Sequence, residues 1–247
     1  MLKYMKLILI MIASLFLNNF ISFNVNASVV MTGTRIIYNE GSRSVDVDLR
    51  NDNNIPYVIQ TWFDKGIMTS GPDEKIKVPF VTTPAIFRMN PNGGQVLKIT
   101  YLGDATLPVD KESVFYFNFI QIPPSNLNSG VSDSNKMLVV LRNRVKLFYR
   151  PSSLLSAERN KFPDLTVTQA AGSASSVSVK NNTPFYVTIS DIYFLNNGKK
   201  SASESGMIAP FGSEVFKLSK SSTVKGKTVN IIVLNDQGAR INEKYSL

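Results

Sequence analysis

The sequence contains no cysteine and no histidine among its 247 residues. The absence of cysteine excludes disulfide frameworks, thiolate zinc sites, iron–sulfur clusters and thiol nucleophiles. The absence of histidine excludes Ser-His-Asp and Cys-His triads, His-ligated zinc and the commonest general base near neutral pH. Carboxylate or lysine chemistry remains open in principle. The composition therefore argues against an enzyme, and we predict neither a metal nor an organic cofactor.

Long apolar runs are scarce, and the only extended one lies at the N-terminus. Lys3 and Lys6 precede an unbroken apolar run over residues 7–13. The run is too short to span a bilayer comfortably, and Val25-Asn26-Ala27 supplies small residues at the positions that a signal peptidase reads. We predict that residues 1–27 are a cleavable signal peptide. A membrane anchor or a buried N-terminal helix is the alternative.

Positive charge exceeds negative charge: 27 Lys and Arg residues stand against 18 Asp and Glu residues, a formal net charge of +9. Removal of the signal peptide takes away two lysines and leaves 25 minus 18, or +7. Because an exported protein meets little nucleic acid, we predict no nucleic-acid partner. The excess charge instead favours carboxylates or acidic protein surfaces.

Polar and apolar residues alternate in short segments, and helix signals are weak throughout. Residues 44–50 alternate at every step, which predicts a half-buried strand, and residues 57–63 are predicted as the return strand. The polar cluster 51–54 between them is typical of a turn. We therefore predict a hairpin.

The remaining segments predict an all-β protein built of two sandwiches. A polar stretch over residues 152–161 is typical of a linker. It separates a predicted N-terminal domain, residues 28–151, from a C-terminal domain, residues 162–247. The further predicted strands are 78–81, 96–101, 114–122, 137–149, 165–169, 176–180, 186–195, 214–218 and 228–234.

Seven short blocks stand out along the chain: TRIIY (34–38), TPAIFRM (83–89), LPVDKESVFYFN (107–118), IP (122–123), RVKLFYRP (144–151), NTPFYVT (182–188) and LNDQG (234–238). In this order they resemble the periplasmic pilus (fimbrial) chaperones of the chaperone–usher pathway. The resemblance covers nearly all of the chain after the signal peptide, and it implies two immunoglobulin-like sandwiches set in an L or boomerang.

The resemblance assigns a donor role to the strand over residues 137–149. In the family this strand fills a groove in a pilus subunit whose immunoglobulin-like fold is incomplete, which is a form of β-strand addition. On the matching positions, the donor side chains are Met137, Val139 and Leu141. The pattern alone is also typical of a core strand, because the residues between these positions are apolar as well.

Two cations match the family's anchor for the C-terminal carboxylate of the subunit: Arg35 and Lys146. Two cations on one carboxylate form charge-assisted hydrogen bonds. From the residues alone, both could equally be solvated surface charges, and spacing does not separate Lys146 from Arg144 and Arg150. Strict alternation places the donor side chains on the face opposite Lys146, so a bulge or a strong twist near Asn143 would be needed for all four residues to meet one ligand.

Glu112, Arg150 and Asp236 match a family ion-pair set that bridges the two domains and fixes their angle. An arginine shared between two carboxylates can orient domains even where its net stabilisation is small. The alternative is that each is an independent surface charge. The polar loop over residues 125–135 resembles the short-loop branch of the family, although this chain lacks the second-domain disulfide that the branch often carries.

These resemblances imply a periplasmic, non-enzymatic chaperone of a Gram-negative bacterium. It would bind pilus subunits by donor-strand complementation without ATP and deliver them to an outer-membrane usher. An exposed apolar edge raises the alternative that the free protein caps itself as a homodimer. Two other functions remain open: an exported immunoglobulin-like fibre subunit or adhesin, and a carboxylate-dependent hydrolase using Asp73-Glu74 or Asp46 and Asp48.

Overall fold

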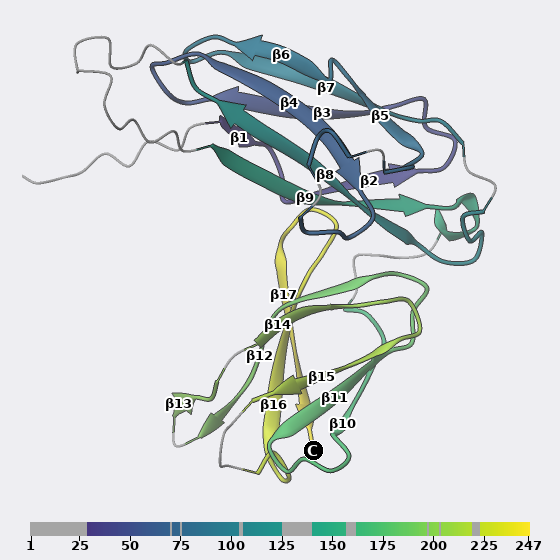
Figure 1. Cartoon of the computed structure of the whole chain (residues 1–247). Helices are drawn as coiled ribbons and strands as arrows, with labels where there is room; N and C mark the ends of the chain where they lie inside the picture. The colour runs from purple at the N-terminus through teal and green to yellow at the C-terminus, as the bar shows by residue number, and fades with distance from the viewer. Residues whose placement is uncertain are drawn as a thin grey trace, which may run out of the picture.

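The computed structural model describes residues 29–69, 71–74, 76–103, 106–124, 140–156, 162–196, 198–202, 204–218 and 223–247. Strands in this part of the chain build two bodies set at an angle to each other (Figure 1). Each body buries its own hydrophobic cluster, so each is a domain with a separate core. The all-β, two-domain prediction is confirmed. Among the described residues, no helix has the length and apolar character needed to cross a membrane.

The N-terminal domain packs two sheets face to face. One sheet has the strand order β1-β3-β7-β5 and the other the order β2-β9-β8-β4-β6. Aromatic side chains from both sheets fill the core between them, among them Phe117 and Phe119, which are fully buried. The strands are β1 (Val29–Met31), β2 (Arg35–Asn39), β3 (Val45–Asn51), β4 (Tyr57–Asp64), β5 (Phe80–Thr83), β6 (Ile86–Met89), β7 (Gly94–Tyr101), β8 (Ser113–Ile122) and β9 (Leu141–Arg150).

The predicted hairpin is wrong, although both of its strands exist. β3 pairs with β1 and β7, whereas β4 pairs with β6 and β8 in the opposite sheet. The buried Asn51 stabilises the connection from β3 to the opposite sheet, because its Nδ2 donates to the carbonyl oxygens of Ile55 and Asn90 at 2.8 and 2.9 Å. Alternation could not reveal this, since a strand buries one face whether its successor lies beside it or across the core.

The C-terminal domain also consists of two packed sheets. Their strand orders are β10-β11-β15 and β13-β12-β16-β17, and β14 pairs with the edge of β12 opposite β16. A short 3-10 helix, η2 (Ser152–Leu154), leads out of the first domain. The strands are β10 (Leu165–Gln169), β11 (Ser176–Asn181), β12 (Val187–Asn196), β13 (Lys199–Lys200), β14 (Glu204–Ile208), β15 (Ser213–Lys217), β16 (Thr228–Leu234) and β17 (Arg240–Ser246).

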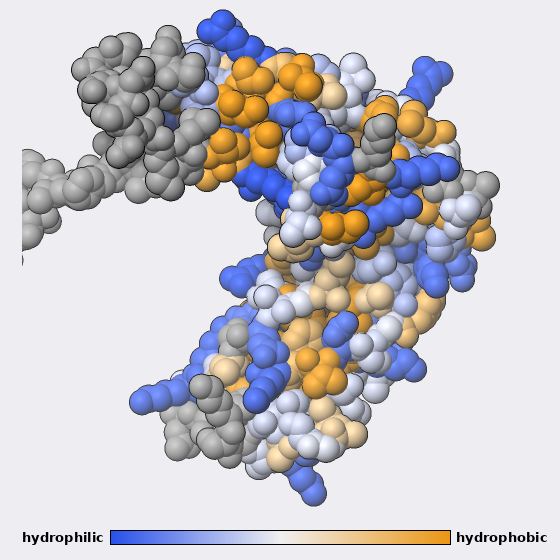
Figure 2. Space-filling view, viewed as in Figure 1, coloured by the Kyte–Doolittle hydropathy of each residue, from blue (hydrophilic) through white to orange (hydrophobic). Residues whose placement is uncertain are grey.

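The N-terminal segment changes sheets, and this change prepares the candidate site. β1 belongs to one sheet of the first domain and β2 to the other. Gly33 lies between them with φ +91°, a left-handed conformation that only glycine adopts readily. Within the part of the chain that the structure describes, the switch leaves residues 141–145 of β9 without a neighbouring strand on the side that β2 occupies further along. The concave side of the molecule is visible in the space-filling view as a hollow between the domains (Figure 2).

Candidate functional site

An open strand edge forms the first part of the candidate site. β9 pairs with β8 from Leu141 to Tyr149, but β2 pairs with β9 only from Lys146 to Arg150. Within the described ranges, residues 141–145 of β9 therefore have no strand beside them on the other side. Their outward N–H and C=O groups form a template for strand addition.

Of the three donor residues, only Leu141 can be placed, because Met137 and Val139 lie outside the described residues. Leu141 is 52% exposed at the start of β9. β9 has no bulge near Asn143: the pairing of β8 with β9 runs without a register shift from Ser113 opposite Tyr149 to Gln121 opposite Leu141. Leu141 and Lys146 therefore do lie on opposite faces of β9. A partner strand added at the edge would still meet both, because its own side chains alternate between the faces.

Arg35 and Lys146 lie side by side on neighbouring strands. They are directly paired in the parallel register of β2 with β9, at the point where the open edge ends. Arg35 donates from Nη1 to the carbonyl oxygen of Leu234 in the second domain at 3.0 Å, and its guanidinium lies 6.0 Å from the ring centre of Phe148. The first cation is thus held by both domains.

The environment of Lys146 disfavours its charge. Burial lowers the pKa of Lys146 below its ordinary value of 10.5, and the positive charges of Arg35 and Arg144 lower it further. No acidic group in the described part of the chain pairs with Lys146. A bound carboxylate would supply the missing negative charge, so the electrostatics fit an anion site.

Arg144 and Arg150, which the sequence could not separate from Lys146, both form ion pairs with acidic residues. Arg144 forms a two-point ion pair with the fully buried Asp64, with Nη2 to Oδ1 at 2.6 Å and Nε to Oδ2 at 3.1 Å. Burial alone would raise the pKa of Asp64, but hydrogen bonds from Arg144, Asn118 and the backbone N–H of Gly66 hold it below its ordinary value. Sequence reasoning missed Asp64, because it ends a strand 80 residues before Arg144 and no spacing connects them.

The structure brings Glu112, Arg150 and Asp236 together between the domains. Arg150 is 7% exposed; its Nη2 lies 2.8 Å from Glu112 Oε1 and its Nη1 lies 3.0 Å from Asp236 Oδ2. Glu112 also accepts a hydrogen bond at Oε2 from the backbone N–H of Tyr186 in the second domain, at 2.9 Å. Burial opposes the charge of Arg150, but the two carboxylates outweigh it and raise the pKa of Arg150.

One turn of the second domain contacts both the Arg35–Lys146 pair and the ion-pair cluster of Arg150. The turn between β16 and β17 carries the Leu234 carbonyl, which holds Arg35, and Asp236, which holds Arg150. Gly238 completes it with φ +82°, and a Cβ at this position would lie 2.6 Å from Thr34 Oγ1. A side chain at position 238 would therefore require the Thr34 hydroxyl or the turn itself to move.

Replacing Gly238 by alanine should destabilise the protein and loosen the contact between its two domains. The new methyl group must displace the turn from Thr34, in addition to the backbone strain of about 1–2 kcal/mol. Denaturant unfolding measures the first effect, and small-angle scattering, which reports the spread of domain angles, measures the second. Gly226→Ala is the matched control, because Gly226 has φ +71° but open space around it. Equal losses in the two variants would contradict a role for the Thr34 contact.

Comparisons with known proteins agree with this architecture. The family model for pili and flagellar-assembly chaperones, PapD N-terminal domain, matches residues 28–155, and the model for the C-terminal domain of the pili assembly chaperone PapD matches residues 161–245. The chaperone protein HifB of Haemophilus influenzae is 34% identical over 95% of this chain and 94% of its own length.

Two solved structures share the fold. The CupB2 chaperone of Pseudomonas aeruginosa superimposes with a TM-score of 0.71 at 32% identity, over 88% of this chain and 100% of that one. The Salmonella enterica SafB chaperone, solved in complex with the SafA pilin, gives a TM-score of 0.72 at 22% identity, over 92% of this chain and 99% of that one.

Two immunoglobulin-like domains of these types, joined in this order, define a pilus-assembly chaperone. The chain belongs to the PapD-like family of periplasmic pilus chaperones. It is a non-enzymatic protein that binds pilus subunits in chaperone–usher assembly, and neither the fibre-subunit nor the hydrolase alternative gains support.

Proposed function

We propose that this chaperone binds a pilus subunit by lending it the open edge of β9, with Arg35 and Lys146 holding the subunit's C-terminal carboxylate. The observation that carries the proposal is the coincidence of two features: no described strand pairs with the edge over residues 141–145, and this edge ends where the two cations meet. Met137, Val139 and Leu141 would be the side chains that enter the subunit groove.

The geometry also supports a direction for the added strand. β9 runs toward the cations, and β2 occupies the edge beyond them. A chain that ends at Arg35 and Lys146 must therefore approach along residues 141–145 and run parallel to β9. The cations would fix the register, which main-chain hydrogen bonds alone leave free to slip by two residues.

The proposal extends to processing and partners. We place signal-peptide cleavage after Ala27, a linker over residues 152–161, and the protein in the short-loop branch, supported by the moderate length of the polar segment 125–135 in the sequence. The loaded chaperone would deliver its subunit to an outer-membrane usher. Without a subunit, the apolar start of β9 would favour capping by a second copy, since exposed strand edges associate readily.

Replacing Leu141 by aspartate should prevent recovery of subunit complexes. A charged side chain would have to enter an apolar groove without a partner, which costs several kcal/mol. The measurement is co-expression in a periplasm with candidate subunits from the same operon, followed by pull-down. Val96→Asp is the matched control, because Val96 is 46% exposed on the other sheet. Equal recovery of subunits with both variants would rule out the donor role of Leu141.

A further inference from the structure

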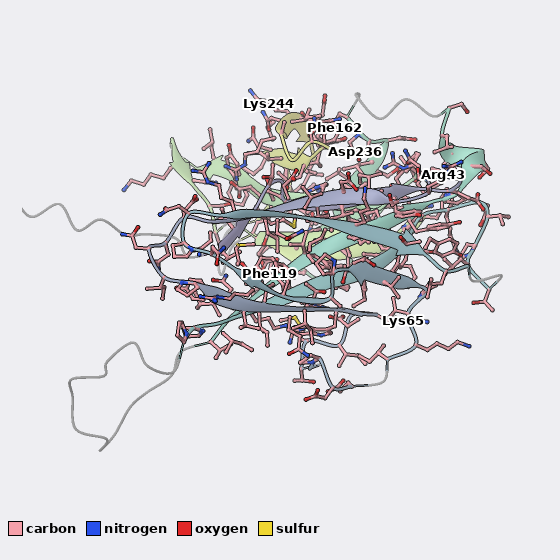
Figure 3. The ribbon with its side chains drawn as sticks, turned by 90° about the horizontal axis from the view of Figure 1, so that it is seen from above. Arg43, Lys65, Phe119, Phe162, Asp236 and Lys244 are labelled. Atoms are coloured by element: carbon pink, nitrogen blue, oxygen red, sulfur yellow. The ribbon has the colours of Figure 1, made fainter. Side chains whose placement is uncertain are left out.

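A buried glutamine joins the two sheets of the first domain. Gln121 on β8 bonds to β1 in the opposite sheet: its Oε1 accepts a hydrogen bond from the backbone N–H of Val29, and its Nε2 donates to the Val29 carbonyl oxygen, both at 3.0 Å. Gln121 is only 3% exposed. Phe119, labelled in Figure 3, lies two residues earlier on the same face of β8 and packs in the core. A buried amide is tolerated there because both of its ends are paired.

These hydrogen bonds help to decide which sheet the start of the domain joins. β1 pairs with β3, and Thr32 extends that pairing by donating its N–H to the Asp48 carbonyl oxygen at 3.0 Å. Gly33 then turns the chain with φ +91°, and β2 begins at Arg35 beside β9 in the other sheet. Residues 29–32 are therefore held in the sheet that does not contain β9.

The same segment has a second place to pair. β2 is parallel to β9 with Arg35 opposite Lys146, and this register continued backward places residues 30–34 opposite residues 141–145. Those five positions are the edge of β9 that no described strand covers. The segment has the sequence VMTGT, in which three β-branched residues favour an extended strand. The move requires Gly33 to pass from a left-handed to an extended backbone, and glycine adopts both.

We propose that Gln121 is a positioning residue for subunit binding: it keeps the edge of β9 open by holding β1 in the opposite sheet. This inference rests on the proposed strand addition. Residues 30–34 compete with the subunit's C-terminal strand for the same main-chain groups of β9. The burial of Val29, which is 3% exposed, and its two hydrogen bonds to Gln121 favour the open form. Cleavage after Ala27 would leave β1 tethered only through Gly33, so it could change sheets without unthreading.

Peptide affinity measures how often the edge is open. The probes are synthetic 16-residue peptides with the C-terminal sequence of a subunit from the same operon. Gln121→Met keeps the length of the side chain and removes both hydrogen bonds to Val29. We expect this variant to bind the peptides about fivefold more weakly than wild type, because apparent affinity falls with the fraction of molecules whose edge is open.

Gly33→Ala tests the same equilibrium without touching the core. Alanine disfavours the left-handed φ of the open form but not the extended backbone of the capped form, so peptide affinity should fall by a similar factor. A Cβ at position 33 would come no closer than 3.8 Å to the Arg35 carbonyl oxygen, so the effect is not steric. Gly41→Ala is the matched control, because Gly41 has φ +86° and open space around it. It should bind as wild type does.

A disulfide trap measures the position of the segment directly. The chain contains no cysteine, so Thr32→Cys combined with Asn143→Cys supplies one pair, at positions that face each other only in the capped register. We expect an intramolecular disulfide under mild oxidation. It should form several-fold faster when Gln121→Met is added, more slowly with saturating peptide, and at an unchanged rate when Gly41→Ala is added. A purely structural role for Gln121 would not bring residue 32 to residue 143.

The outcomes separate this inference from the proposed function. A covalent dimer in place of the intramolecular disulfide, or a rate that neither Gln121→Met nor the peptide changes, overturns the inference. The proposed function still stands in that case if the peptides bind wild type and lose affinity in Lys146→Met. If neither peptide nor whole subunit binds wild type, the proposed function fails, and the role of Gln121 in subunit binding fails with it.

Discussion

Replacing Lys146 by methionine is expected to abolish the capture of pilus subunits while raising the melting temperature of the free protein. Truncating one partner of a desolvated, hydrogen-bonded charge pair costs roughly 2–5 kcal/mol, which lowers affinity at least about 30-fold. The free protein instead gains stability, because the substitution removes a partly buried charge beside Arg35 and Arg144. That burial and those charges already lower the pKa of Lys146. We expect its melting temperature to rise by about 2 °C.

The same residue predicts opposite pH dependences for stability and binding. The pKa of Lys146 is lower in the folded protein than its ordinary value of 10.5, so between the two values the unfolded chain binds more protons. The stability of the free wild type therefore rises with pH across that window. A carboxylate favours protonated lysine, so subunit affinity falls across the same window.

Thermal unfolding and peptide titrations between pH 8 and 11 measure both effects of Lys146. The Lys146→Met variant should lose the lysine's contribution to the pH dependence of stability and to that of binding. Lys98→Met is the matched control, because Lys98 is an exposed lysine paired with Asp46 on the other sheet. A Lys146→Met protein that binds subunits as tightly as wild type would remove Lys146 from the anchor.

Strands were predictable from the sequence where one face meets water. Residues 44–50 alternate strictly, and β3 has the matching pattern of buried and exposed residues. β17 was not predicted, because only Ile241 and Tyr245 of its residues pack against the core and the remainder are polar. The pairing partners of the strands were harder to predict than the strands themselves. The burial of one face is the same for a hairpin and for a connection between sheets.

The site shows the same division between local pattern and long-range contact. Arg35 and Lys146 could be named only through the resemblance of short blocks, because two cations 111 positions apart have no spacing rule. The choice between Lys146 and its neighbouring arginines depends on Asp64 and Asp236, which bind Arg144 and Arg150 from distant strands. Asp64 and Asn118 gave no signal in the sequence, since each acts through a contact across strands rather than through a motif.

Replacing Arg150 by methionine should destabilise the protein by about 3–5 kcal/mol and loosen the angle between its domains. The substitution leaves Glu112, only 3% exposed, without its cation, and it releases Asp236 and the turn that carries it. Because that turn also holds Arg35 through the Leu234 carbonyl, subunit affinity should fall although no anchor residue is changed. Denaturant unfolding measures the stability, and small-angle scattering measures the spread of domain angles.

A neutral version of the same cluster separates stability from orientation. Combining Arg150→Met with Glu112→Gln and Asp236→Asn removes every unpaired charge, so we expect most of the lost stability to return. The directional constraint does not return, because no group then links β9 to the β16–β17 turn by charge. The triple variant should therefore unfold near the wild-type denaturant concentration and yet keep the broad scattering profile and the weak subunit binding. If it recovered wild-type affinity together with stability, the three residues would stabilise the domains without orienting them.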